Sequence, residues 1–342
     1  MKPIGIAVIG CGVIGPTHAQ SFLLDKNVDL VAACDIVPER ARAMAGRFGF
    51  RKAVASPAKV FADPEVQAVS ICTPHHNHAR LCREALAAGK DVLCEKPIAN
   101  TLEGLRLVAQ SARDFPDRVF AGVFQHRYNP VYRTLREMVA DGSFGTPLTA
   151  AFHNRCLRTA DYYNSDAWRG TARYERGGVL LNQAIHQLDI FQWIMGGAKD
   201  VCSFKDNIAH KGVIQVEDTI AGAVRFNCGA IGTVEATSAA ITPWDTLVEI
   251  TGTAGAVSVA DGNLAKAEFA DKSCERRLAA AQKAHDAKKD SRVGRSYYGS
   301  GHPAQIADFL HCIRTRSTPF VSALDAIAAP ELVLKLYGAA KR

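Results

Sequence analysis

The segment VLCEKPIAN, residues 92–100, places a lysine directly after an apolar stretch. Charged side chains are rarely buried without a partner. Lys96 therefore either pairs with Glu95 at a wet rim of the fold or belongs to a site that uses its amine. A partly desolvated lysine has a lowered pKa, which suits proton exchange with a hydroxyl group. The residues alone leave both interpretations open.

A glycine-rich segment, GCGVIG at residues 10–15, follows the apolar run at residues 3–9. This GxGxxG pattern binds the pyrophosphate of a dinucleotide when it joins a strand to a helix. The first glycine permits the tight turn, the second lets backbone N–H groups approach the phosphates, and the third lets helix and strand pack closely. The start of the helix also favours an anion. The predicted cofactor contacts in this segment are Gly10, Gly12, Val13, Ile14 and Gly15.

Asp35 follows the next apolar run, residues 28–34, and stands twenty residues after Gly15. A carboxylate at this place accepts hydrogen bonds from the adenosine ribose, and it would repel a 2′-phosphate. The following residue is Ile36, where an arginine would favour NADP. We therefore predict NAD as the cofactor, with Asp35 and Ile36 beside its adenosine. The alternative is a surface aspartate next to an ordinary glycine turn.

Strands and helices alternate through this part of the chain. The predicted strands are residues 3–9, 28–34, 66–72, 91–94 and 118–124. This alternation is typical of βαβ units and of a doubly wound parallel sheet, the Rossmann arrangement. Ligands of such sheets bind beyond the carboxyl ends of the strands. The sequence therefore predicts further cofactor contacts at Thr73, Pro74, Asn77, His78, Glu95 and Lys96.

Three histidines lie close together at residues 75, 76 and 78. No companion cluster of ligand residues accompanies them, so we predict no metal. The formal net charge is +7, and residues 271–295 are rich in charges of both signs. Such a stretch is usually a solvated face. Because no aromatic residues are interleaved with its basic residues, it does not indicate a nucleic-acid partner.

The length of 342 residues suggests two domains. The sequence has no apolar run of ~18 residues, so we predict no membrane span. We recognise no leader with a small-residue cleavage site. The ten cysteines are scattered without zinc-type pairing. Buried, reduced thiols are the simplest interpretation of these cysteines, so we expect a cytoplasmic protein.

Three segments together resemble the Gfo/Idh/MocA oxidoreductases, the family that includes glucose-fructose oxidoreductase and inositol dehydrogenase. They are AVIGCGVIGPTHAQ, CTPHHNHARLCREALAAGKDVLCEKPIANT and GGVLLNQAIHQLDIFQWIMG. The likeness covers nearly the whole chain, in the same order and spacing. It implies an N-terminal Rossmann domain and a C-terminal α/β domain built on an open, mostly antiparallel sheet. It also implies that Lys96 is the catalytic lysine.

The pattern of the chain changes near residue 124, in agreement with this resemblance. In later runs such as DTIAGAVRFN and GAIGTVEATSAA, apolar residues alternate with other residues, and glycine-containing turns separate the runs. Such runs are typical of an antiparallel sheet. We therefore predict two continuous domains: residues 1–124 bind NAD, and residues 125–342 bind substrate and form the oligomer interface.

A helix predicted at residues 179–195 carries Asn182, His186 and Asp189 at spacings that place them on one face. From the residues alone, His186 is either satisfied inside the core or part of a lined cleft. By resemblance, His186 is the second catalytic residue and Asp189 is a substrate contact. Inositol-dehydrogenase-like members have an aspartate where this chain has Asn182. Because an amide cannot relay a proton, Asn182 is expected only to hold a sugar hydroxyl.

The same resemblance implies functional roles for further residues. Trp168 and Arg169 match a pair that reaches the cofactor in the family. Gln125 and Arg127 end the last Rossmann strand, and we expect them to contact cofactor and substrate, respectively. Tyr298 is expected either to close the cofactor site or to pack in the core.

Together these assignments predict reversible oxidation of a secondary ring hydroxyl of a sugar, a sugar derivative or a cyclic polyol, with Lys96 as acid/base. Some relatives instead retain NAD and use transient oxidation for glycoside cleavage, elimination or epimerisation. A non-catalytic NAD-binding regulator is a third class. Relatives usually assemble through the open face of the C-terminal sheet, so the resemblance implies a homodimer or homotetramer. The sequence leaves open which sugar and which carbon react.

Overall fold

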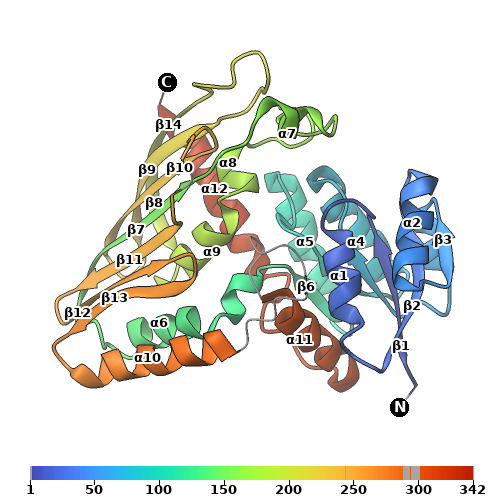
Figure 1. Ribbon diagram of the computed structural model, residues 1–342, viewed down its shortest axis with the longest axis horizontal. Helices are drawn as coiled ribbons and strands as arrows, with labels where there is room; N and C mark the ends of the chain where they lie inside the picture. Colours follow the sequence, from blue (N-terminus) through green and yellow to red (C-terminus); the bar gives the residue numbers. More distant parts are fainter. Residues whose placement is uncertain (1, 243, 288–292, 294–300, 342) are drawn as a thin grey trace. The chain divides into compact units, whose positions relative to one another are not determined.

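The computed structural model describes residues 2–242, 244–287, 293 and 301–341. Contacts divide the chain into two compact units (Figure 1). Of the described residues, the first unit contains those up to Gln125, Val293, and those from Gly301 to Ile327. The second unit contains the remaining segments, which begin at His126 and at Ala328.

A six-stranded parallel sheet forms the centre of the first unit. Its strand order is β3-β2-β1-β4-β5-β6. The chain builds outward from β1 to β3 on one side and then from β4 to β6 on the other, which defines a doubly wound sheet, as predicted. The strands are β1 (Ile4–Ile9), β2 (Val28–Cys34), β3 (Lys52–Val54), β4 (Ala68–Ile71), β5 (Asp91–Cys94) and β6 (Phe120–Gly122). The helices are α1 (Gly15–Phe22), α2 (Pro38–Phe48), α3 (Pro57–Ala62), α4 (His78–Ala87), α5 (Leu102–Asp114) and α11 (Gly301–Thr315), with short 3-10 turns η1 (His75–Asn77) and η4 (Asp325–Ile327).

The first unit is not the continuous segment that the sequence predicts, because α11 returns to it. The apolar side chains of Ile306, Phe309 and Leu310 join the same buried cluster as Phe22 of α1. The side chain of Gln305 also donates a 2.8 Å hydrogen bond to the carbonyl oxygen of Gly122 in β6. A helix expected in the second domain therefore completes the core of the first.

The second unit is built on an eight-stranded sheet with the order β13-β12-β11-β7-β10-β9-β8-β14. Five of its neighbouring strand pairs are antiparallel and two are parallel, so the predicted mostly antiparallel sheet is confirmed. The strands are β7 (Pro147–Arg155), β8 (Ala198–Asp206), β9 (Thr219–Phe226), β10 (Ile231–Thr237), β11 (Leu247–Gly252), β12 (Gly255–Ala260), β13 (Asn263–Phe269) and β14 (Ala340–Lys341).

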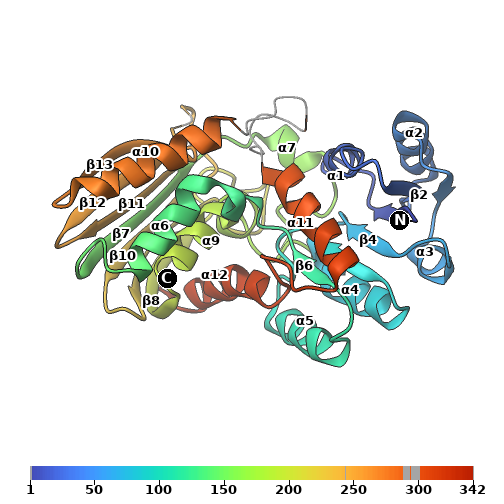
Figure 2. The same ribbon diagram turned by 90° about the horizontal axis from the view of Figure 1, so that it is seen from below.

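Helices of the second unit gather on one face of this sheet (Figures 1 and 2). They are α6 (Pro130–Ala140), α9 (Ile185–Ile194), α10 (Lys272–Ala287) and α12 (Ala328–Gly338), accompanied by the shorter α7 (Ala160–Asn164) and α8 (Val179–Asn182). A further 3-10 turn, η2 (Gln125–Tyr128), spans the boundary between the units. None of the helices in the described part of the chain has the length and hydropathy that a membrane span needs.

The single helix predicted at residues 179–195 is wrong, because the structure divides it into α8 and α9. The buried carboxylate of Glu217 accepts hydrogen bonds from the backbone N–H groups of Gly178 and Leu180, at 2.9 and 3.3 Å. This carboxylate satisfies N–H groups that a helix start leaves without intrahelical partners. The short α8 is therefore held by a residue distant in sequence, and a second helix starts after it.

Candidate active site

The turn between β1 and α1 contains three glycines. Two of them are closely surrounded by other atoms of the chain, and the third is not. Gly10 has a φ of 101°, and a Cβ there would lie 2.4 Å from the carbonyl oxygen of Cys72. A Cβ on Gly15 would lie 2.4 Å from the carbonyl oxygen of Gly10. A Cβ on Gly12 would meet no other atom of the chain within 4 Å. The fold therefore explains Gly10 and Gly15, whereas Gly12 leaves space for a ligand to approach the backbone, as the pyrophosphate of a dinucleotide requires.

Asp35 is fixed beside this turn. One carboxylate oxygen accepts a hydrogen bond from the Cys11 N–H and the other from the Val37 N–H, each at 2.9 Å. The next residue, Ile36, is 84% exposed. An oriented carboxylate next to an open glycine turn fits the adenosine ribose and pyrophosphate of NAD. Val13 is half exposed, and Ile14 precedes the first residue of α1.

The residues after β4 lie at the carboxyl edge of the same sheet. Thr73, Pro74 and Asn77 are partly exposed there, around η1. His78 is instead fully buried, and its ring nitrogens lie 2.7 Å from the Thr73 carbonyl oxygen and 2.8 Å from that of Pro97. Burial lowers the pKa of His78. The imidazole thus links the loops after β4 and β5, which supports the site rather than lining it.

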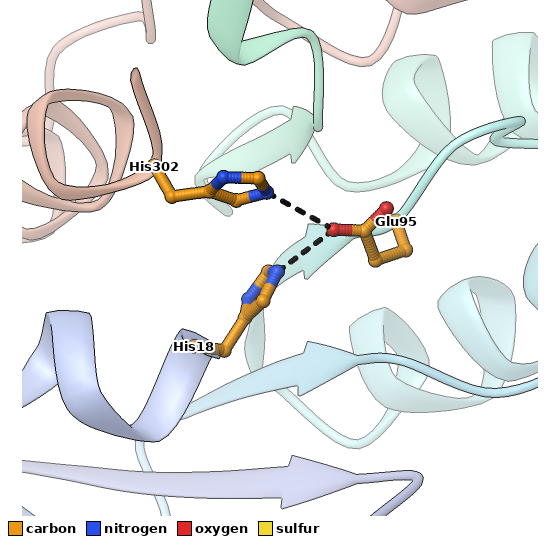
Figure 3. Close-up of side chains that lie close together, drawn as sticks. All are labelled: His18, Glu95 and His302. Carbon is orange, nitrogen blue, oxygen red and sulfur yellow. Dashed lines mark hydrogen bonds and ion pairs between the residues drawn. The ribbon is translucent and has the colours of Figure 1, made fainter. Parts of the chain in front are cut away.

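Glu95 and Lys96 come directly after β5, but their side chains have different surroundings. Lys96 is partly exposed, whereas Glu95 is only 5% exposed. One Glu95 oxygen lies 2.8 Å from Nε2 of His18 and 3.7 Å from Nε2 of His302 (Figure 3). The other oxygen accepts a 3.1 Å hydrogen bond from the backbone N–H of Lys96. The carboxylate therefore turns into the core of the first unit.

The three side chains in Figure 3 come from α1, the end of β5 and the first turn of α11. Their ligand atoms lie within 4.8 Å of one another, a spacing that by distance alone would suit a metal ion. The 2.8 Å contact between His18 and Glu95 is, however, an ordinary charge-assisted hydrogen bond. The other ring nitrogen of His18 lies 2.7 Å from the hydroxyl of Ser70. We therefore assign this cluster to hydrogen bonding within the fold.

Electrostatics in this cluster favour the charged forms of both partners. Burial alone would lower the pKa of His18, but the Cys72 thiol and the Glu95 carboxylate raise it above its ordinary value. Burial alone would raise the pKa of Glu95, but the hydrogen bond from His18 and the nearby imidazole of His302 hold it well below its usual range. His302 has a lowered pKa because of its burial. The cluster is best described as an ion pair between His18 and Glu95 beside a neutral His302.

In the second unit, Arg127 and Asp189 form a buried ion pair. Two guanidinium nitrogens donate to the two carboxylate oxygens, at 2.6 and 2.7 Å. The exposed fractions of the side chains are 2% and 0%. The guanidinium also lies over the ring of Trp193, 5.2 Å from its centroid. Arg127 and Asp189 were both predicted to contact substrate, but in this structure their charges face each other inside the fold.

Asn182 and Asp189 belong to different helices, because Asn182 ends α8 and Asp189 lies on α9, and the Asn182 side chain has a different partner. Its amide donates hydrogen bonds to the Glu175 carboxylate and, at 3.4 Å, to the hydroxyl of Tyr162. Burial raises the pKa of Glu175 to about 7, although hydrogen bonds from Gly170 and Asn182 oppose the change. A carboxylate that titrates near neutrality therefore does lie next to position 182.

The predicted Trp168–Arg169 pair belongs to the same part of the second unit. Arg169 donates a 2.7 Å hydrogen bond to the Tyr162 hydroxyl, and its guanidinium lies over the rings of Tyr162 and Trp168, at 4.5 and 4.8 Å from their centroids. His186, on α9, is partly exposed and stacks on His126 with 5.1 Å between ring centroids. Gln125 is buried at the end of the first unit's first segment. Tyr298 lies outside the described residues.

Sequence reasoning missed several residues of these clusters. They are His18, Ser70 and His302 in the first unit and Tyr162, Glu175 and His126 in the second. A weak signal existed for two of them: His18 stands three residues after the glycine motif, and Glu175 shortly precedes the Gly177–Gly178 pair. Nothing in the local sequence connects His302 with His18, because their contact depends on the return of α11.

Comparison with known proteins agrees with this geometry. Residues 4–123 match the family model of the oxidoreductase family with an NAD-binding Rossmann fold, and residues 132–258 match the model of the GFO/IDH/MocA C-terminal domain. The chain belongs to the Gfo/Idh/MocA family of oxidoreductases. Its cofactor is NAD.

Several relatives have named activities. The myo-inositol 2-dehydrogenase of Thermotoga maritima is 28% identical over 260 residues, 74% of each chain. The 1,5-anhydro-D-fructose reductase of Ensifer adhaerens is 32% identical over 226 residues, 66% of each chain. Among solved structures, the WlbA dehydrogenase of Bordetella pertussis, in complex with NADH and UDP-GlcNAcA, has a TM-score of 0.88 at 24% identity. The match covers 99% of this chain and 96% of that one, which shows a shared fold.

Proposed function

We propose that this protein is an NAD-dependent dehydrogenase that oxidises a secondary ring hydroxyl of a sugar, a sugar derivative or a cyclic polyol. The observation that carries the proposal is the position of Lys96. It follows β5 at the carboxyl edge of the sheet that also presents the glycine turn and Asp35. Ligands of doubly wound sheets bind at this edge.

The names of two relatives support the substrate class. One is a dehydrogenase of myo-inositol, which is a cyclic polyol, and the other is a reductase of 1,5-anhydro-D-fructose, which is a sugar derivative. Both names describe redox chemistry between a hydroxyl and a carbonyl.

In the proposed reaction, each of the chain's residues has a limited task. Bound NAD supplies the hydride acceptor. The glycine turn and Asp35 hold and orient it, and Lys96 takes the proton of the substrate hydroxyl as its carbon is oxidised. His186 is proposed to hydrogen-bond a substrate oxygen. Asp189 and Arg127 are left out of this scheme because each neutralises the other inside the fold.

NADH formation by the purified protein tests the proposal. The substrates would be inositols, free pyranoses, glycosides and UDP-sugars, each supplied with NAD or with NADP. Lys96→Met, which keeps the length of the side chain and removes the amine, should lower kcat at least about 100-fold, the contribution expected of a positioned general base. Lys90→Met is a matched control, because Lys90 lies at the opposite end of β5 and donates to the carbonyl oxygens of Asp63 and Val66.

Each outcome of this assay has a defined meaning. NADH formation from one ring class that is lost in Lys96→Met and kept in Lys90→Met supports the proposal. Preference for NADP would contradict the role of Asp35. Turnover of a glycoside or epimerisation without net NADH would replace the dehydrogenase with an enzyme that oxidises its substrate transiently. Full activity of Lys96→Met would remove the lysine from the mechanism.

A further inference from the structure

A continuous chain of hydrogen bonds leads from the core of the first unit to the backbone of Lys96. Ser70, in β4, contacts one ring nitrogen of His18 at 2.7 Å, and the other ring nitrogen contacts Glu95 at 2.8 Å. The second carboxylate oxygen of Glu95 accepts the N–H of Lys96 at 3.1 Å. His18 and Ser70 are 0% exposed. Water therefore does not screen this chain.

The buried carboxylate of Glu95 must be stabilised by other groups of the fold. Transfer of an ionised carboxylate from water into a protein interior is costly unless a positive partner and hydrogen bonds accompany it. Here α1 supplies the partner through His18, and α11 supplies His302 at 3.7 Å (Figure 3). Two helices from distant parts of the sequence thus converge on the residue that immediately precedes Lys96.

We propose that His18 is a positioning residue for Lys96 that acts through Glu95: the imidazolium fixes and neutralises the carboxylate, which in turn holds the Lys96 backbone. The inference rests on the proposed function, in which Lys96 exchanges the substrate proton. Without the positive charge of His18, the negative charge of Glu95, the preceding residue, would stabilise the protonated form of the Lys96 amine. Because His18 balances that charge, the lysine can release its proton more easily.

Other titratable groups face this chain from neighbouring elements. They are Cys72 after β4, His78 on α4, Cys94 in β5 and His302 on α11. Burial lowers the pKa of both His78 and His302, and it raises the pKa of the Cys94 thiol. His18 and Glu95 are thus the members of this cluster whose pKa shifts favour the charged form.

The pKa of Lys96 can be measured without any substrate. In protein labelled with ¹³C-lysine, the resonance of Lys96 is assigned by its absence in Lys96→Arg and is followed through a pH titration. His18→Gln keeps a hydrogen-bond donor toward Glu95 but removes the positive charge, so it should raise the pKa of Lys96 by about one unit. Glu95→Gln removes the negative charge and should lower it by about one unit. Opposite shifts are a signature that a purely structural role would not produce.

Arg316→Gln is the matched control. Arg316 contacts Asp91 at 2.9 Å, and this carboxylate, which is 1% exposed, lies at the opposite end of β5. The variant removes the cation of a similar ion pair in the same sheet, and it should leave the pKa of Lys96 unchanged. If His18→Gln does not fold, Glu95→Gln and the milder Ser70→Ala, which removes only the hydroxyl contact of His18, decide the question.

The results separate this inference from the proposed function. Unchanged pKa values of Lys96 in the folded variants would overturn the inference, even if Lys96→Met abolishes dehydrogenase activity. Opposite shifts would support it, even if the substrate assay later assigns Lys96 a different task. A stoichiometric divalent metal ion in the purified protein that is lost in His302→Gln would also overturn it, because the cluster would then be a metal site.

Discussion

The buried Arg127–Asp189 ion pair allows a quantitative test of what holds the second unit together. Asp189→Ala removes one partner and leaves the guanidinium of Arg127 without its carboxylate in a region where both side chains are at most 2% exposed. Removing one member of a buried ion pair typically costs about 3–5 kcal/mol of unfolding free energy. Two charge-assisted hydrogen bonds, at 2.6 and 2.7 Å, place this pair in that range.

Tryptophan fluorescence during urea unfolding would measure this loss. The chain has three tryptophans, Trp168, Trp193 and Trp244, and all of them belong to the second unit. Trp193 lies 5.2 Å from the guanidinium of Arg127, so the signal reports the environment of the pair directly. With a denaturant slope of about 2–3 kcal/mol per molar urea, the midpoint should fall by roughly 1–2.5 M.

A double variant completes the argument. Arg127→Met combined with Asp189→Leu removes both charges and fills the space with apolar side chains. Because replacing a whole buried ion pair is often neutral, this variant should recover most of the stability that Asp189→Ala loses. The reasoning is refuted if Asp189→Ala unfolds at the native midpoint but binds substrate poorly. Asp189 would then be the substrate contact that the family resemblance implies.

Other expected outcomes concern the cofactor site, a buried acid and the open sheet face. Gly12→Ala should weaken NAD binding in a fluorescence titration with little change in stability, because its Cβ meets no other part of the chain, whereas Gly10→Ala should also destabilise the fold. Burial raises the pKa of Glu175 from an ordinary value of 4.5 to about 7. The folded state thus retains a proton that the unfolded chain releases, so stability of the second unit should fall as pH rises through this interval, and Glu175→Gln should flatten that dependence in urea midpoints. On the sheet of the second unit, Phe204 and Ile231 are 63% and 49% exposed. If a homodimer forms through this sheet, Phe204→Asp should yield monomers in light scattering. A monomeric native protein would contradict the expectation.

The dinucleotide edge could be predicted because its signals are local. The glycine turn, Asp35 after β2 and Lys96 after β5 each stand next to an apolar strand, and parallel strands of a doubly wound sheet bring their carboxyl ends to one edge. Alternation of strands and helices was sufficient to predict the sheet. Neither inference required knowledge of contacts between distant segments.

The remaining features depend on long-range partners. Glu217 holds the start of α8, and it lies 39 residues from Gly178 in the sequence. Arg127 and Asp189 are 62 residues apart, and no periodicity indicates that they pair. The spacing within one helix predicted a shared polar face, but it could not show that a distant cation would neutralise one of its members.

The return of α11 also constrains how the chain is made. During synthesis, the first 125 residues contain every strand of the six-stranded sheet, yet Phe22 remains without its partners Ile306 and Phe309 until the last tenth of the chain emerges from the ribosome. The nascent sheet must therefore keep an apolar patch exposed while the strands β7 to β13 of the second sheet are translated. A shortened chain that ends after β6 would keep this patch permanently, so it should aggregate rather than serve as a separate NAD-binding module.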